Sequence, residues 1–467
     1  MKSTCLLFTY SLALVGLSGC AAHSTVAQSK MTLPADWKNA AGFPVASPSR
    51  DLSRWWGRFN DPTLNRLIAS ALQNSPDIES ATARVREARA NRDSQQASLF
   101  PQLDGGVSAN SRRNRNEGIG TNSSNGYSAG LNASWEVDLF GRNRSSVQSA
   151  AANLGAAGEN LHSVHASLAA EIATAYANLR TNEARLAVLK ENLTTREETA
   201  RLAGWRLQAG EADSLEATQS QSSLESARAA MPSLQGAISQ GKNDLALFAG
   251  RVPGELDSML TSSRGIPVPP TSLAVGIPAD VVRQRPDVRI AGYQVLAAAA
   301  STRATEATKY PSLNLTGSLG LDTASSRKLF DPESAAANLA GNITSPIFDA
   351  GRIKANIEAS RASEDQAISN YRKTVLTALS ETENALIACR RSAERLTSLE
   401  KATRLARESD EVARQRYQAG EIDFLDVLDS QRTLLSLEDN LLTTRTDRTT
   451  AYIRLYQALG GGWSAGS

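Results

Sequence analysis

The stretch YQAGEIDFLDVLDSQ, residues 417–431, is the most informative part of this sequence because the chain contains a close copy of it. The copy is LQAGEADSLEATQSQ at residues 207–221, which is 210 positions earlier. Both contain Ala-Gly followed three residues later by aspartate, an order typical of one helix that ends at glycine and another that begins at an aspartate cap. Only the second copy adds Asp426 and Asp429. The sequence therefore predicts two similar helical hairpins, one of which has aspartates just past its tip.

The offset of 210 residues extends far beyond these two turns. The paired segments are Ser75–Asp77 and Arg285–Asp287, Phe100–Leu103 and Tyr310–Leu313, and Gly141–Arg142 and Gly351–Arg352. So many pairs in one register, including their proline and glycine residues, indicate a duplication. We expect one fold made of two like halves, at residues 61–250 and 279–460. The proline-rich residues 251–278 are expected to link them, and residues 461–467 to form a short tail.

Each half contains one unusually long helical segment without proline. These segments run from residue 141 to 208 and from residue 351 to 418. At a rise of about 1.5 Å per residue each helix would be about 100 Å long. Leucines spaced by seven residues favour coiled-coil packing. We expect the hairpin tips at Gly210 and Gly420. Four further residues are expected at the junctions between strands and helices: Pro101, Gly141, Pro311 and Gly351.

Each half is also expected to have a shorter helix, from Pro76 to about Leu99 and from Pro286 to about Lys309. Between this helix and the long helix, apolar or small residues alternate with polar ones. This alternation predicts strands at about residues 102–113, 127–138, 312–322 and 336–347. A strand of about eleven residues can cross a bilayer when it is tilted. Two half-buried hairpins in a soluble domain would show the same pattern, so the strands alone leave both interpretations open.

The N-terminus has the features of a secretory signal peptide at residues 1–19, with Lys2 followed by a short apolar stretch. The sequence Leu17-Ser18-Gly19-Cys20 then resembles a lipoprotein signal, which predicts lipid attachment at Cys20. Ordinary cleavage that leaves a free thiol is the alternative. Residues 20–60 are expected to be a linker. No later run has the length of a transmembrane helix.

Composition and motifs argue against several classes of protein. A net charge of +2 gives no electrostatic footprint for nucleic acid. No P-loop, glycine fingerprint or Ser-His-Asp set occurs in a suitable context, so we expect neither an enzyme nor a cofactor. Glu159, His162 and His165 are spaced as a helical trio, but no fourth ligand accompanies them, and a metal site is not expected. Cys389 is the only cysteine left for the mature chain once Cys20 is lipidated, so no disulfide framework is expected.

Four features together resemble the TolC-like outer membrane factors, and among them the NodT-type lipoproteins of RND efflux systems. They are the lipoprotein signal, GIPADVVRQRPDV at residues 276–288, the tip at residues 417–431, and ALGGGW at residues 458–463. The resemblance covers essentially the whole mature chain. It implies a mixed α/β membrane protein in which three chains each give four strands to one β-barrel, continued by a long periplasmic α-helical barrel.

The resemblance also implies a function. The protein would be the outer membrane channel of a tripartite efflux system, a homotrimer anchored in outer membrane lipid. Its partners would be a periplasmic adaptor and an inner membrane RND-type transporter, and substrates would leave through it to the exterior. Two alternatives stay open: a lipid-anchored periplasmic coiled-coil protein with a structural role, and the outer membrane duct of a type I protein secretion system.

Finally, the resemblance assigns roles at the second tip. The periplasmic aperture would be lined by Leu425, Asp426, Asp429 and Arg432. The contacts that close it would involve Tyr417, Arg416 and Glu421. Three chains would bring six carboxylates around one axis, and such a ring selects cations. The alternative is a solvated acidic helix face without a role in the channel.

Overall fold

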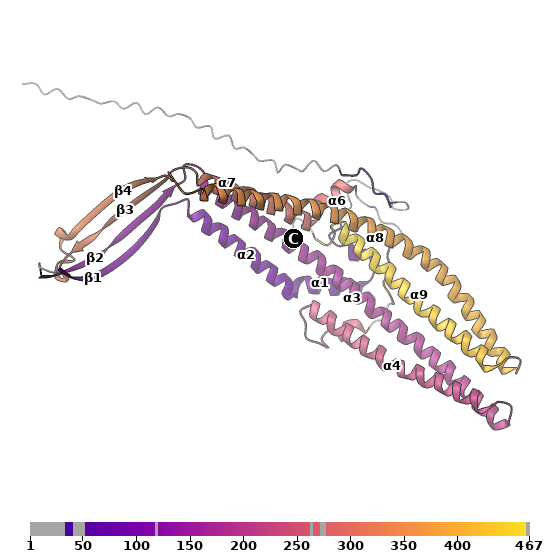
Figure 1. Ribbon diagram of the computed structural model, residues 1–467. Helices are drawn as coiled ribbons and strands as arrows, with labels where there is room; N and C mark the ends of the chain where they lie inside the picture. Colours follow the sequence, from indigo (N-terminus) through magenta and orange to yellow (C-terminus); the bar gives the residue numbers. More distant parts are fainter. Residues whose placement is uncertain (1–32, 41–51, 117–119, 262–264, 271–276, 464–467) are drawn as a thin grey trace, which may run out of the picture.

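The computed structural model describes residues 33–40, 52–116, 120–261, 265–270 and 277–463. Cys20 and the signal peptide lie outside the described residues. The described chain is elongated, with a four-stranded sheet at one end and two helical hairpins at the other (Figure 1). A thicker middle region separates them, and no described helix is both long enough and apolar enough to cross a membrane.

The main elements of the two halves recur in the same order: a helix, two strands, a very long helix and a returning helix. The first half comprises η1 (Trp55–Phe59), α1 (Pro62–Asn74), α2 (Pro76–Ala97), β1 (Gln102–Asn116), β2 (Gly120–Val137), α3 (Arg142–Ala209) and α4 (Ser214–Phe248). Two short helices follow, α5 (Asp257–Leu260) and α6 (Pro278–Gln284). The second half comprises α7 (Pro286–Ala307), β3 (Ser312–Thr323), η2 (Ser326–Lys328), η3 (Pro332–Ser334), β4 (Ala335–Thr344), α8 (Arg352–Gln418) and α9 (Phe424–Ala458).

The four strands form one antiparallel sheet in the order β1-β2-β3-β4. Its register places the apolar positions of all four strands on the same face, because Leu131 pairs with both Gly105 and Leu319. The neighbouring row, on the other face, is polar: Asn132 pairs with Asp104 and with Ser318. The apolar face is bare in the single chain, where Leu319 is 65% exposed. The outer edges of β1 and β4 are also unpaired within the described sheet.

Three strand boundaries differ from those expected. β1 ends at Asn116 and not near residue 113, and β2 begins at Gly120 and not near residue 127, because the polar residues before Tyr127 continue the ladder with β1. Ladder hydrogen bonds are made by the backbone and need no apolar side chain. β4 ends at Thr344 and not at 347, since Pro346 lacks an N–H and restricts the residue before it.

Two glycines let β2 and β3 approach each other closely. A β-carbon at Gly320 would lie 2.6 Å from the carbonyl oxygen of Ala129, and one at Gly130 would lie 2.8 Å from the Cα of Gly320. The obstructing atoms belong to the backbone and cannot turn away. Only glycine therefore fits this pair while the strands keep their curvature.

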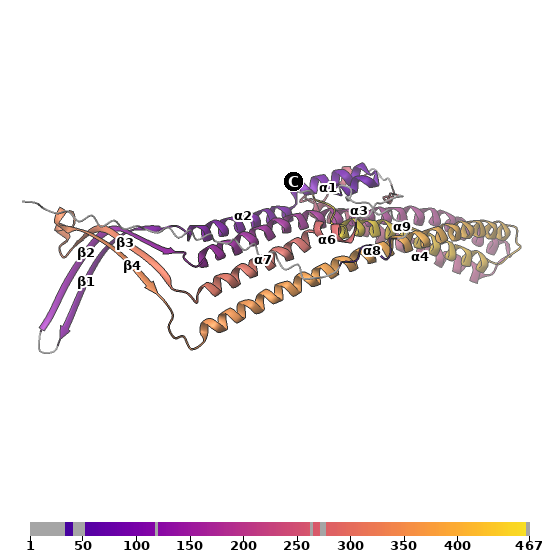
Figure 2. The same cartoon turned by 90° about the horizontal axis from the view of Figure 1, so that it is seen from above.

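Four helices run side by side between the sheet and the middle region, in the order α2-α3-α7-α8 (Figure 2). Beyond the middle, α3 packs with α4 and α8 packs with α9 to form the two hairpins. α3 has 68 residues and α8 has 67. Gly141 and Gly351 precede these helices with φ values of 79° and 88°, a backbone conformation that favours glycine.

The middle region contains the main hydrophobic core, and described parts of the two segments expected to be linkers pack into it. Trp55 is 1% exposed and stacks on Tyr456 at 5.2 Å between ring centroids. Leu260, in the segment between the halves, is also 1% exposed. These segments pack because large apolar side chains gain free energy on burial. We use the name collar for η1, α1, α5 and α6, which cover the middle of α3, α8 and α9.

Candidate functional site

The two hairpin tips share one backbone geometry. Gly210 and Gly420 have φ values of 77° and 76°. In the first tip the N–H of Glu211 donates to the carbonyl of Arg206 at 2.8 Å, and in the second the N–H of Glu421 donates to the carbonyl of Arg416 at 2.9 Å. Each long helix therefore ends in a left-handed glycine that satisfies its last carbonyls.

The helices that leave the tips begin differently. Asp213 caps α4, since its carboxylate accepts a hydrogen bond of 2.9 Å from the N–H of Glu216. Asp423 occupies the same position before α9, but its side chain makes no capping bond. The expectation of an aspartate cap in both tips is therefore wrong for the second. There, the backbone carbonyl of Asp423 accepts from the N–H of Asp426.

A buried tyrosine connects the two hairpins. Tyr417, on α8, is 2% exposed, and its hydroxyl donates to the carboxylate of Glu216 on α4. The guanidinium of Arg206, on α3, lies 5.0 Å from the centre of the Tyr417 ring and 3.7 Å from the Glu216 carboxylate. We name these three residues the latch. Phe424 packs edge-on against the same tyrosine ring.

Burial and the nearby Glu216 carboxylate raise the pKa of Tyr417 from 10.0 to about 12. The folded pKa is therefore higher than the unfolded one. The stabilisation is fully present below pH 10 and is lost as the pH rises towards about 12. The hydroxyl consequently stays a hydrogen-bond donor over the whole physiological range.

The residues expected to line the aperture lie on the exposed face of α9. Leu425 is 58% exposed, and Asp426, Asp429 and Arg432 are exposed as well. The opposite face is buried against the latch and includes Val427 and Leu428. Within the described residues no ion pair or hydrogen bond involves the side chain of Asp426 or of Asp429, so both carboxylates face outward.

Arg416 and Glu421 form an exposed pair within the second tip. The Nε atom of Arg416 lies 3.1 Å from the Glu421 carboxylate, and both side chains are more than half exposed. Within one chain they do not reach the first hairpin, whereas Tyr417 does. The sequence did not indicate that Glu216 and Arg206 are the partners of Tyr417. The only indication in the sequence was that Arg206 lies 210 positions before Arg416, the residue next to Tyr417.

A buried polar layer, which sequence reasoning missed, lies just beyond the latch. Asp410, on α8, is 3% exposed and accepts from Arg414 at 3.0 Å and from Ser430 at 3.1 Å. Arg196, on α3, is buried and donates to Ser223 on α4. Burial lowers the pKa of Arg196, and the charge of Arg432 lowers it further. Arg432, which is expected to line the aperture, thus acts electrostatically on the interior of the hairpins.

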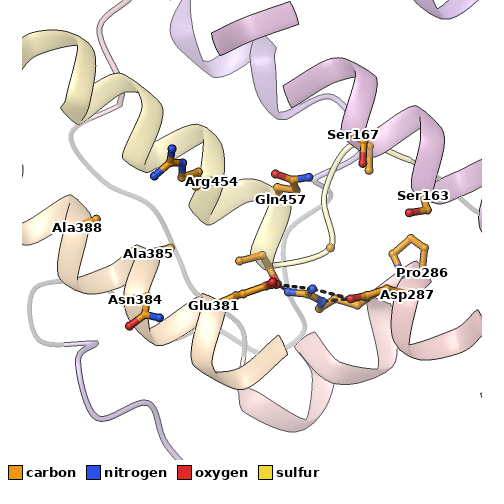
Figure 3. Close-up of a pocket in the computed structure, with 14 residues that line it drawn as sticks. Ser163, Ser167, Pro286, Asp287, Glu381, Asn384, Ala385, Ala388, Arg454 and Gln457 are labelled. Carbon is orange, nitrogen blue, oxygen red and sulfur yellow. Dashed lines mark hydrogen bonds and ion pairs between the residues drawn. The ribbon is translucent and has the colours of Figure 1, made fainter. Parts of the chain in front are cut away.

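A second polar cluster holds the middle of the molecule together (Figure 3). Arg285, at the start of α7, is 7% exposed. Its guanidinium lies 2.7 Å from Asp287 and 2.6 Å from Glu381 on α8, and it donates to the carbonyl of Ala458 at 3.2 Å. Arg285 thus joins the start of α7, the middle of α8 and the end of α9. Arg285 and Asp287 are the residues of the sequence GIPADVVRQRPDV that belong to this cluster.

Replacing Arg285 by methionine should destabilise the protein by about 1.5–3 kcal/mol, the usual contribution of hydrogen bonds to a charged group. The loss should lie near the lower end of this range, about 1.5 kcal/mol, because Asp287 and Glu381 are 41% and 52% exposed and stay solvated. Denaturant unfolding of the purified protein measures the change. Arg283→Met, on the neighbouring helix α6, is the control. Equal stability of both variants would contradict the bridging role of Arg285.

Glu159 and His162, two members of the helical trio, make contacts with neighbouring side chains. The Glu159 carboxylate lies 2.7 Å from Arg289 and 3.3 Å from the Nδ1 atom of His162. The His162 ring stacks on Trp463 at 4.4 Å. Among the described residues no group of three potential ligands is arranged to hold a metal ion. These contacts fasten the end of the chain to α3.

Comparison with known proteins identifies the family. The family model described as outer membrane efflux protein matches residues 67–251 and 277–461, which are the two halves of the chain. The chain belongs to this family. As an outer membrane efflux protein it has a fold in which a β-barrel is continued by an α-helical barrel, as the resemblance implied.

Relatives of known name cover nearly the whole chain. The solvent efflux pump outer membrane protein SrpC of Pseudomonas putida is 32% identical over 462 residues, 97% of each chain. The cation efflux system protein CusC of Escherichia coli (strain K12) is 30% identical and covers 98% of this chain and 100% of its own.

Solved structures agree with these sequence matches. The outer-membrane channel OprN superposes with a TM-score of 0.86 at 32% identity, over 92% of this chain and 97% of its own. The open state of the MtrE outer membrane channel of Neisseria gonorrhoeae gives 0.80 at 30% identity, over 93% and 96%. This efflux protein is therefore an outer membrane channel whose helices extend into the periplasm.

Proposed function

We propose that three copies of this chain form the outer membrane duct of a tripartite efflux pump, together with a periplasmic adaptor and an inner membrane RND-type transporter. The observation that carries this proposal is the sheet: one face is apolar in register across four strands and is bare in the single chain. A face of this kind suits contact with lipid, and the polar face then lines a lumen. The chain would act as a conduit and not as an enzyme.

The unpaired edges of the sheet support the trimer. Four strands are too few to close into a barrel, and an open edge in the hydrocarbon region leaves backbone groups without partners. If β4 of one copy pairs with β1 of the next, three copies supply twelve strands and no edge is left. The residues just beyond β4, among them Ile347 at 93% exposure, would be covered in the same assembly.

The hairpins would then form the periplasmic entrance. In this proposal Leu425, Asp426, Asp429 and Arg432 face the axis at the narrowest point, and the latch holds each second hairpin against the first. Gly210 and Gly420 mark the end that meets the adaptor. Arg416 and Glu421 lie at the same end and are available to a neighbouring chain.

Cys20 would anchor each copy to the membrane. Every buried methylene of an acyl chain contributes about 0.8 kcal/mol, so two or three chains hold a protein firmly. Mass spectrometry of the mature N-terminus tests this part, and an unmodified cysteine there would contradict it.

Native mass spectrometry and planar bilayer recording of the purified protein test the duct itself. We expect a trimer that conducts ions. Cysteines at Ser325, beside the β3–β4 connection, should react with a membrane-impermeant maleimide on intact cells. Cysteines at Ala209 or Ala419, at the tips, should not react. A monomer without conductance would favour the structural coiled-coil alternative, and labelling of the tips would reverse the proposed orientation.

A further inference from the structure

The duplicated helices α3 and α8 differ in how much of one face is covered. Along α3 the residues Ala152, Glu159 and Ala166 are buried, Ala166 with 7% exposure. The residues 210 positions later on α8 are Ala362, Ser369 and Leu376, and all three are exposed, Leu376 at 57%. This face of α3 is turned towards α7 and the collar, whereas the same face of α8 has no covering element in the described chain.

The helices α2 and α7 show the reciprocal difference. On α7, Ala297 is 7% exposed, and its carbonyl accepts a hydrogen bond of 3.0 Å from Ser149 on α3. The equivalent residue on α2 is Glu87, which is exposed. One bare face therefore lies on α8 and a matching bare face lies on α2, at opposite ends of the α2-α3-α7-α8 layer (Figure 2). A second copy of this chain would bring the two faces together.

The polar clusters in the middle of the two halves differ in one residue. In the second half Arg285 bridges Asp287 and Glu381. In the first half the counterparts of these carboxylates are Asp77 and Glu171, but serine occupies the position of the arginine. Burial and the charge of Asp77 raise the pKa of Glu171. Within the described residues neither carboxylate has a basic partner.

The counterpart of the residue that faces Arg285 carries a positive charge. In the second half the cavity around Arg285 is walled by Ser163 of α3 (Figure 3). The residue of α8 that corresponds to Ser163 is Lys373, which is exposed and makes no ion pair among the described residues. In the second half, which has Arg285, the facing residue is thus Ser163. In the first half Ser75 stands in place of the arginine, and the counterpart of the facing residue is Lys373.

We infer that in the trimer Lys373 of the partner subunit lies beside Asp77 and Glu171, and supplies the charge that Arg285 supplies in the second half. α8 of one protomer then packs on α2 of the next as α3 packs on α7 within the chain. The inference rests on the homotrimer of the proposed function, and adds the seam between protomers and the residues that fasten it. Arg454 also borders the Glu171 cavity, but forms no ion pair with Glu171 in the described structure.

Cross-linking tests the position of the lysine. In the variant Lys373→Cys/Asp77→Cys, a short bis-maleimide should produce covalent dimers and trimers on a denaturing gel. The matched control is Ser163→Cys/Asp287→Cys, the equivalent pair within one chain, which should stay monomeric in mass. The native Cys389 should not interfere, because burial raises the pKa of its thiol to about 12.

A charge test examines the role of the lysine. Lys373→Glu should lower the temperature at which trimers dissociate in detergent, because it places a third negative charge beside two others. Adding Asp77→Asn and Glu171→Gln should restore that temperature. Lys401→Glu, an exposed lysine further along α8 whose counterpart Glu191 is exposed on α3, should have little effect.

The outcomes separate this inference from the proposed function. A trimer by native mass in which Lys373→Cys/Asp77→Cys forms no covalent oligomers would overturn the seam and leave the duct intact. A monomer by native mass would overturn the homotrimer itself. Cross-linking without rescue by the carboxylate substitutions would place the lysine at the seam, but would refute its pairing with Asp77 and Glu171.

Discussion

Replacement of Asp426 and Asp429 by alanine is expected to remove the cation selectivity of the channel, raise its conductance and relieve block by trivalent cations. Three copies of the chain would place six exposed carboxylates around one axis. One pair of unit charges about 4 Å apart in water contributes about 1 kcal/mol. A trivalent cation in the ring interacts with more than one carboxylate, so the total exceeds the contribution of one pair. Because a difference of 1.4 kcal/mol changes affinity tenfold, loss of the ring should weaken trivalent block by about tenfold or more. Bilayer recordings on purified trimers measure all three quantities.

Two further variants make this experiment specific. Asp426→Asn/Asp429→Asn keeps the size of the side chains and should behave like the alanine variant, which would exclude a purely steric effect. Glu211→Ala removes an exposed acid from the first tip and should leave selectivity unchanged. If the double alanine variant keeps the selectivity and block of the native channel, these aspartates do not line the aperture and form only a solvated helix face.

Loss of the latch is expected to leave a channel that leaks without a pump. Tyr417→Phe removes the hydroxyl that donates to Glu216, and Arg206→Met removes the cation beside both. A hydrogen bond to a charged group contributes about 1.5–3 kcal/mol. If these contacts break when the aperture opens, three latches in one trimer favour the closed state by several kcal/mol. The double variant should then show much larger conductance in bilayers in the absence of a pump.

A variant of the exposed pair Arg416 and Glu421 at the second tip tests whether these residues or Tyr417 close the aperture. Arg416→Gln/Glu421→Gln removes an ion pair that is more than half exposed on both sides, and exposed pairs contribute about 0–1 kcal/mol. This variant should leak little. If it leaks as much as the latch variant, closure also depends on contacts of Arg416 and Glu421 with a neighbouring chain. If the latch variant stays closed, Tyr417 has only a packing role.

Most of the architecture could be predicted because it is encoded over short distances. The alternation around Leu131 and the glycines at 210 and 420 are local signals, and the structure has a strand and two tips there. The resemblance supplied the residues that are expected to line the aperture. It did not supply Glu216 as the acceptor of the Tyr417 hydroxyl, because the two residues are 201 positions apart.

The sequence by itself determined the duplication, the long helices, the alternation of the strands and the glycines at which the chain reverses. The duplication is visible in the residues alone as one repeated offset of 210 positions. The other three depend on residues a few positions apart, whose propensities act before any distant contact forms. Only the tertiary structure decided the sheet register, the packing of the collar, the latch, and the buried layer of Arg196 and Asp410. These features depend on contacts between segments that are far apart in the sequence, many of them along helices about 100 Å long. Packing and the pairing of buried polar groups determine such contacts collectively.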